Sequence, residues 1–268
     1  MCGRYALFGN PKRGEADLPP GFGNGYTERV LNPLQAVDAE YNIAPTQVMP
    51  VCTLGEGGPG LESMRWGLLP AWAKDAKKAY STINARAETV RTAPAFRDAW
   101  RQDQRCLVPA SGWYEWVDEG GAKKQPYFVQ AADSANPMML AGLFSRWSGP
   151  EGRDVATYTI LTTEARGAIA AIHHRSPRVL LAGDWQTWLE GTAGEAAAFL
   201  EPQAVPLQVQ RVGLAVGNPR NKGEQLMAER NYAKARLEFR NAVQIDPKDA
   251  TARVRAGEAA ERLGNFSE

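Results

Sequence analysis

Residues 127–144 read Tyr-Phe-Val-Gln-Ala-Ala-Asp-Ser-Ala-Asn-Pro-Met-Met-Leu-Ala-Gly-Leu-Phe, the pattern that decides the fold. Two short apolar segments, Tyr127–Ala131 and Met138–Phe144, flank a cluster of Asp, Ser, Asn and Pro, which predicts two β-strands separated by a turn. The same pattern recurs along the first two-thirds of the chain. The other predicted strands are Val48–Leu54, Arg105–Val108, Tyr158–Thr162, Val179–Leu181 and Leu207–Val216, the last with a bulge near Arg211.

Helices are fewer in this part of the chain. Pro94, followed by Phe96 and Trp100 at a spacing of four residues, predicts one helix, and Asp184 as an N-cap predicts a second over Trp185–Leu189. Short strands with occasional helices indicate an α+β fold. We expect a mixed, largely antiparallel, barrel-like β-sheet with covering helices.

The pattern changes after Asn218, where Glu, Ala, Arg and Leu recur at helical spacing. The segment at 231–234 returns in similar form at 265–268, a period of 34 residues that resembles the tetratricopeptide repeat. We therefore expect two units, residues 1–223 and a helical appendage at 224–268. One and a half repeats cannot bury their own faces, so the apolar positions should pack against the main domain, pack against another copy or remain poorly ordered. These positions are Leu237, Phe239, Val243 and Ile245. The alternative is that the tail is a C-terminal helical hairpin of the main domain.

Composition narrows the function classes. The chain has 268 residues and a net charge of +1, so any nucleic-acid binding must rely on a local patch. The sequence has neither a long apolar run nor a secretory leader, which predicts a cytoplasmic protein without membrane contact. Cys2, Cys52 and Cys106 show no disulfide or metal spacing, and we expect Cys52 and Cys106 to lie in the core. No metal or other cofactor is expected.

Cys2 is the strongest chemical candidate. A small residue after the initiator methionine normally lets the cell remove that methionine, which leaves Cys2 as the N-terminus. The residue would then carry an amine and a thiol close together. Such a pair can attack an acyl carbon, or it can condense with an aldehyde and close to a thiazolidine ring. Met-Cys alone also has a trivial reading as an accident of the start codon, so the remaining sequence must decide.

Six motifs occur in order along the chain. They are MCGRY at 1–5, YNIAPT at 41–46, RWGLLPAW at 65–72, INARAET at 83–89, RCLVPASGWYEW at 105–116 and IHHRSP at 172–177. This ordered set resembles the SOS-response-associated peptidase family of abasic-site processing proteins. The resemblance extends to about Met227.

The resemblance implies that Cys2 traps the ring-opened aldehyde of an abasic deoxyribose in single-stranded DNA as a stable thiazolidine. It implies a catalytic set of Cys2, Asn84, Glu115 and His173. The Asn84 amide would hold the sugar or the N-terminus, and Glu115, set among three aromatic residues, would act as a general acid and base. His173 would carry protons, and His174 is expected at the surface. Ser176 departs from the family pattern, which leaves the packing under His173 open.

The DNA contacts implied are Arg4, Arg86 and Arg175 to phosphates, and Pro45, Trp66, Leu68 and Trp72 to bases. We expect a monomer that associates with the nucleoid when DNA is damaged. Each residue also has a purely structural alternative. Asn84 could stabilise a turn, and Glu115 could be an exposed strand carboxylate. Most of the eight tryptophans are expected in the core, with Trp72 at the surface.

Two other functions fit parts of the sequence. An N-terminal-nucleophile amidohydrolase or peptidase would also begin Met-Cys-Gly, but the glycine-rich opening and the Asn-Gly oxyanion segment of the amidotransferases are not found. A peptidase that removes only its own methionine would also explain the family name. The remaining alternative is an inert interaction module whose helical tail recruits a partner. Formation of a heat-stable adduct with abasic single-stranded DNA distinguishes these functions.

Overall fold

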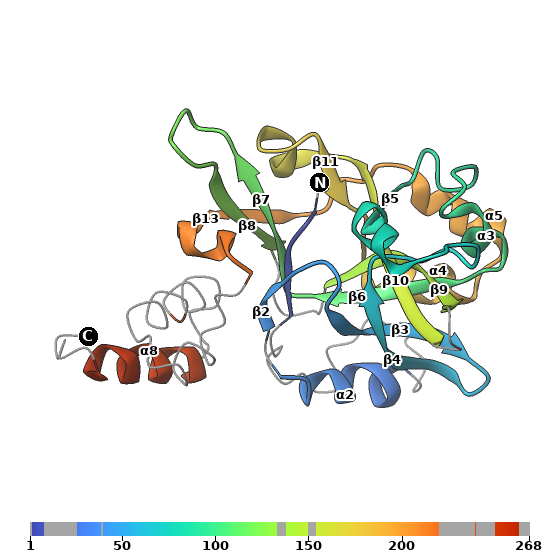
Figure 1. The fold of residues 1–268 in the computed structure, drawn as a ribbon, viewed down its shortest axis with the longest axis horizontal. Helices are drawn as coiled ribbons and strands as arrows, with labels where there is room; N and C mark the ends of the chain where they lie inside the picture. The colour runs from blue at the N-terminus through green and yellow to red at the C-terminus, as the bar shows by residue number, and fades with distance from the viewer. Residues whose placement is uncertain are drawn as a thin grey trace.

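The computed structural model describes residues 2–7, 26–38, 40–132, 138–149, 154–219, 239 and 250–262. Two β-sheets pack together, and short helices lie along the outside of the larger one (Figure 1). The five-stranded sheet has the order β13-β8-β7-β1-β2. Its strands are β1 (Tyr5–Leu7), β2 (Glu40–Ile43), β7 (Gly112–Val117), β8 (Gln125–Ala131) and β13 (Leu207–Arg211).

The eight-stranded sheet has the order β11-β10-β4-β3-β6-β9-β12, with β5 paired to β10. Its strands are β3 (Val48–Gly55), β4 (Gly58–Trp66), β5 (Asn84–Arg86), β6 (Arg105–Ala110), β9 (Met138–Ser148), β10 (Asp154–Glu164), β11 (Arg175–Pro177) and β12 (Val179–Leu180). Among the described strands, only β10 forms parallel pairs, with β4 and with β5. The α+β class with a largely antiparallel sheet is therefore confirmed.

The main core fills the space between the two sheets. Tyr5 and Trp113 enter it from the smaller sheet, and Trp66 and Tyr158 enter it from the larger one, all wholly buried. A second core lies on the outer face of the larger sheet under the helices. The helices are α2 (Asn32–Gln35), α3 (Arg97–Arg101), α4 (Trp185–Glu190) and α5 (Ala193–Ala197). The chain also forms one π-helical turn, η2 (Thr27–Leu31), and the 3-10 turns η3 (Ala76–Thr82), η5 (Gly167–Ala171), η6 (Ala182–Asp184) and η7 (Ala198–Leu200).

One strand prediction is wrong in its extent. β13 ends at Arg211, and residues Leu214–Gly217 form the 3-10 turn η8 where a bulged strand was expected. The partner strand explains this, because the residue of β8 opposite Val212 is Pro126, which has no backbone N–H to continue the ladder. The Val212 amide donates to the Pro126 carbonyl at 3.1 Å, and Val212 and Val216 then turn into a small core with Phe128.

Both predicted helices are present, but Asp184 does not cap α4 as expected. It stands at the N-terminal end of α4, yet its side chain makes no capping hydrogen bond to that helix. Its carboxylate instead accepts from the Leu181 amide at 3.2 Å, so it closes the preceding turn η6. The prediction that Cys52 and Cys106 lie in the core is confirmed, because both are fully buried.

In the tail, the structure describes Phe239 and helix α8 (Ala250–Arg262). Phe239 packs with Ala256 and Ala259 of α8, in a cluster that contains no residue of the two sheets. Helix α8 lies to one side of the sheets in Figure 1. The 34-residue repeat at 231–234 and 265–268, and the apolar positions Leu237, Val243 and Ile245, lie outside the described residues. Within the described part of the chain, no helix is both long and apolar enough to span a membrane.

Candidate active site

The N-terminal segment runs through the five-stranded sheet, between β2 and β7. Tyr5 pairs with Trp113 of β7, and the Tyr114 amide donates to the Arg4 carbonyl at 2.9 Å. Because the two strands are antiparallel, the chain before Tyr5 runs toward Glu115. In Figure 1 the amino terminus lies at the same end of the molecule as β5 and β11. The pairing of β1 with β7 therefore places Cys2 at the same end of the molecule as the other predicted catalytic residues.

Cys2 is 1% exposed and belongs to the core between the sheets. Its thiol donates to the Arg4 carbonyl, with sulfur and oxygen 3.8 Å apart. Burial raises the pKa of the Cys2 thiol far above its ordinary value, and the negative charge of Glu115 raises it further. The resting thiol is therefore neutral at physiological pH and needs a proton acceptor before it can act as a nucleophile.

Asn84 holds the main chain of Cys2. It is the first residue of β5, where it pairs with Ile160 of β10. Its side-chain amide donates to the Cys2 carbonyl at 2.6 Å. The amide oxygen Oδ1 is buried and has no hydrogen-bond partner among the described residues. Asn84 thus joins the N-terminal segment to β5 of the larger sheet, and its Oδ1 keeps an unused acceptor position among the described residues.

Glu115 is 3% exposed, which contradicts the alternative of an exposed strand carboxylate. Burial raises the pKa of Glu115 from 4.5 to about 7, and the positive charge of the chain's amino terminus partly opposes this rise. A carboxyl group with a pKa near 7 is present in both protonation states at neutral pH. It can therefore act as both proton donor and proton acceptor within one reaction.

His173 lies two residues before β11, in a turn fixed by backbone contacts. Its amide donates to the Ile169 carbonyl at 2.9 Å, and its ring nitrogen Nδ1 accepts from the Arg175 amide at 2.9 Å. Burial lowers the pKa of His173, and neighbouring positive charges, those of Arg175 and Lys124 among them, lower it further.

His174 is exposed, as predicted. The centroids of the two histidine rings lie 4.4 Å apart and the rings stack, so the two side chains lie on the same side of the chain. The reason is the turn before β11, which has not yet adopted the alternation of a strand.

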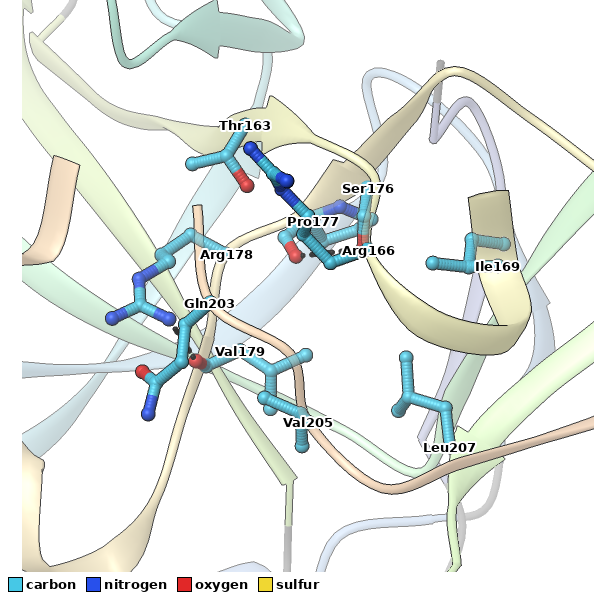
Figure 2. A pocket seen from close by; sticks show the side chains of 10 residues that line it. All are labelled: Thr163, Arg166, Ile169, Ser176, Pro177, Arg178, Val179, Gln203, Val205 and Leu207. Carbon is cyan, nitrogen blue, oxygen red and sulfur yellow. Dashed lines mark hydrogen bonds between the residues drawn. The ribbon is translucent and has the colours of Figure 1, made fainter. Parts of the chain in front are cut away.

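Ser176 lines a small pocket behind β11. Figure 2 shows Ile169, Val205 and Leu207 among the other side chains that line it. The Ser176 hydroxyl donates to the Pro177 carbonyl at 3.0 Å. The packing under His173 stays open, and the hydrogen bonds of His173 with the Ile169 carbonyl and the Arg175 amide hold its turn.

The three predicted phosphate contacts are placed differently. Arg86 is exposed and follows Asn84 by two residues on β5, so both side chains lie on the same face of the strand. Arg4 is half-buried: its guanidinium donates to Asn42 Oδ1 at 2.6 Å and to the Val216 carbonyl at 3.1 Å. Arg175 is 9% exposed and pairs with Glu88. Of these three arginines only Arg86 is exposed, and the DNA roles of all three stay predictions.

The predicted base contacts divide in the same way. Trp72 is 48% exposed, as expected for the surface tryptophan, and Pro45 is partly exposed. The expectation that Trp66 and Leu68 offer apolar surface to bases is wrong for this conformation, because both are fully buried. The Trp66 indole donates to the Ile83 carbonyl at 2.9 Å, and its ring stacks on Tyr158.

Sequence reasoning missed Tyr80, which is 66% exposed on the turn η3 that leads into β5. Its position four residues before Asn84, within the same turn-to-strand segment, is the signal that could have identified it. With Trp72 it gives the segment 72–80 two exposed aromatic side chains. No cluster of metal-binding side chains occurs among the residues that the structure describes.

Comparisons with known proteins cover most of this chain. Residues 1–219 match the family model described as SOS response associated peptidase (SRAP). The chain is 32% identical over 231 residues to the abasic site processing protein YoqW of Bacillus subtilis, covering 85% of this chain and 99% of YoqW. It is 32% identical to the abasic site processing protein HMCES of Gallus gallus over 167 residues, covering 53% of this chain and 49% of HMCES.

Among solved structures, a protein from Bacteroides thetaiotaomicron superposes with a TM-score of 0.61 at 26% identity, covering 72% of this chain and 87% of that one. A protein from Bordetella bronchiseptica shares the fold, with a TM-score of 0.63 at 23% identity over 80% of this chain and all of its own. The family match spans both sheets and every residue of the candidate site. The chain belongs to the SOS response associated peptidase (SRAP) family.

Proposed function

We propose that this protein processes abasic sites in single-stranded DNA by forming a covalent thiazolidine link between Cys2 and the ring-opened sugar. The observation that carries the proposal is the Asn84 amide bound to the Cys2 carbonyl at 2.6 Å. This contact fixes the main chain of Cys2 through its carbonyl oxygen and does not use the nitrogen or the sulfur, the two atoms that would react. The names of the relatives, abasic site processing proteins, support the same reaction class.

The reaction balances without a cofactor. After removal of Met1, the Cys2 amine attacks the aldehyde carbon of the ring-opened deoxyribose, and loss of one water gives an imine. The thiol sulfur then attacks the imine carbon, and the thiol proton moves to nitrogen. Two new bonds, carbon–nitrogen and carbon–sulfur, close the five-membered ring. The product resists hydrolysis, whereas the imine alone does not.

The neighbouring residues fit the proton transfers of these steps. Glu115, with its pKa raised to about 7, accepts the proton of the buried neutral thiol and returns it to the leaving water or to the ring nitrogen. His173, whose pKa is lowered by burial, is neutral at pH 7 and can exchange a proton with the sugar hydroxyl during ring opening. The orphaned Asn84 Oδ1 accepts from the sugar or from the new N-terminal amine.

DNA would approach over the exposed side of β5 and η3. Arg86 contacts a phosphate there, and Trp72 and Tyr80 present aromatic faces to unpaired bases. Pro45 adds an apolar edge beside Thr46, whose backbone φ of 75° is unusual for a β-branched residue and marks a strained turn. This surface suits a flexible single strand.

Single-stranded abasic DNA should react roughly tenfold or more faster than the same lesion inside a continuous duplex. A duplex must first unstack and unpair around the lesion, at a cost of a few kcal/mol. Intact mass spectrometry after incubation with each oligonucleotide measures the rate, and the adduct mass also reports loss of Met1. Equal rates on both substrates would contradict the proposed surface, and no adduct on either would contradict the proposed function and favour the amidohydrolase alternative.

We propose further that residues 1–223 form the active unit and that residues 224–268 are dispensable. The boundary cannot lie before Asn218, because the Asn42 amide donates to the carbonyls of Val216 and Asn218 at 3.3 and 3.1 Å. Deletion of the chain after Met227 should leave the crosslinking rate within about twofold of the full-length rate, since every motif lies before that residue. The rate and the melting temperature are measured together. An insoluble or inactive truncated protein would show that the tail belongs to the catalytic unit.

A further inference from the structure

Arg175 and Glu88 form a bidentate ion pair at the edge of the candidate site. Arg175 donates from Nη1 to Oε1 of Glu88 at 2.5 Å and from Nη2 to Oε2 at 2.9 Å. Nη2 also donates to the Thr162 carbonyl at 2.5 Å. The guanidinium side chain is only 11% exposed, whereas that of Glu88 is 49% exposed. The carboxylate therefore lies on the solvent side of the pair and covers the cation.

Hydrogen bonds connect the Arg175–Glu88 pair to the strand and the turn that carry the predicted catalytic residues. The Ala87 amide donates to the Thr162 carbonyl at 2.9 Å, the oxygen that Arg175 also contacts, so the end of β5 and β11 meet there. The backbone amide of Arg175 binds the His173 ring. The hydrogen bonds from Arg175 hold the pKa of Glu88 below its ordinary value, and the nearby Arg86 lowers it too. Glu88 is therefore a fixed negative charge beside the site at neutral pH.

A carboxylate and a phosphate make the same two-pronged contact with a guanidinium. With Glu88 in place, both terminal nitrogens of Arg175 already bind an anion, and the remaining nitrogen Nε is buried. A DNA phosphate can bind Arg175 only after Glu88 has moved away. Glu88 is half exposed, and an arriving phosphate would replace one anion by another, so the exchange does not leave the buried guanidinium unpaired.

We propose that Glu88 is a specificity-determining residue, an internal anion that occupies Arg175 in the free protein and competes with the phosphates of DNA. The inference rests on the proposed function, because it requires DNA at this face. An undamaged single strand offers only its backbone contacts, so its phosphates do not displace Glu88 from Arg175. A strand whose abasic sugar also reaches Cys2 is held long enough to displace the carboxylate and then to react.

The test is binding of undamaged single-stranded oligonucleotide to Glu88→Gln between about 50 and 200 mM salt. Glutamine keeps a hydrogen-bond acceptor for Arg175 but removes the charge. We expect binding roughly tenfold tighter at low salt and a slope of log affinity against log salt steeper by about 0.7, the value for one more phosphate on a single strand. The preference for abasic over undamaged DNA should fall correspondingly.

Glu62→Gln is the matched control. Glu62 accepts two hydrogen bonds from Arg146, at 2.6 and 2.8 Å, so the variant makes the same charge change in the same geometry on β4. It should leave the salt slope unchanged. Arg86→Ala calibrates the assay, because loss of one phosphate contact should make the slope shallower.

An unchanged or weaker affinity of folded Glu88→Gln would overturn the inference. If the glutamine variant does not fold, Glu88→Asp keeps the charge that compensates Arg175 but shortens its reach. It should give an intermediate gain in affinity, and no gain would overturn the inference equally. Wild-type protein that binds neither oligonucleotide would instead refute the proposed function itself, so the two failures are distinguishable.

Discussion

Cys2→Ser should abolish the denaturation-resistant adduct with abasic single-stranded DNA. A serine hydroxyl is a far weaker nucleophile than a thiol, so the reaction stops at an imine that hydrolyses. Crosslinked DNA on a denaturing gel, without added reductant, should fall to the background level. Addition of a reductant that traps imines should restore an adduct, because the serine variant retains its N-terminal amine.

An N-terminal tag that cannot be removed should have the same effect as loss of the thiol, since it converts the amine into an amide. Cys52→Ala is the control for the thiol: Cys52 is fully buried in the core under the helices and should not affect the adduct beyond a loss of stability. A stable adduct formed by a protein with a permanently blocked N-terminus would disprove the thiazolidine mechanism.

The strands of the fold were predictable where a strand is apolar along its length. β9 and β10 pair with each other and with further strands of the larger sheet, and most of their residues are buried, so Met138–Phe144 and Tyr158–Thr162 stand out in the sequence. β5 and β11 contain three residues each and exist because β10 supplies partners for both. Local sequence carries no strand signal for segments that short, and the two strands that hold Asn84 and Arg175 were therefore not predicted.

The candidate site was predictable as a set of residues but not as an arrangement. The motifs identified Asn84 and Glu115 as candidates. The burial of Glu115, however, depends on the packing of the two sheets, which the motifs do not show. The sequence could not separate Trp66 from Trp72, because both lie in one motif and only the sheet contacts bury Trp66. The pairing of Glu88 with Arg175 joins residues 87 positions apart and has no local signature.

Glu115→Gln should slow capture of the abasic site by about 10²–10⁴-fold, the usual effect of losing a general acid and base. In the wild type, the carboxylate form predominates above about pH 7, so the capture rate should rise with pH through that value. Release needs the protonated form and should become slower over the same range. Glutamine cannot titrate, so the capture rate of that variant, measured from quenched reactions across pH 5–9, should show no inflection near pH 7.

The same substitution should stabilise the protein at high pH, which separates a catalytic role from a structural one. The folded-state pKa of Glu115 lies near 7, above the ordinary value of 4.5, so the folded protein binds this proton more tightly than the unfolded chain does. Its contribution to stability is fully present below about pH 4.5 and is lost as the pH rises to about 7. Above that, the fold carries a buried carboxylate at a cost on the order of 3 kcal/mol. Glu115→Gln removes that cost, so its melting temperature should exceed the wild-type value at pH 8 and approach it near pH 4.5. A variant that lost both activity and stability at pH 8 would show that Glu115 supports the fold and not the proton transfer.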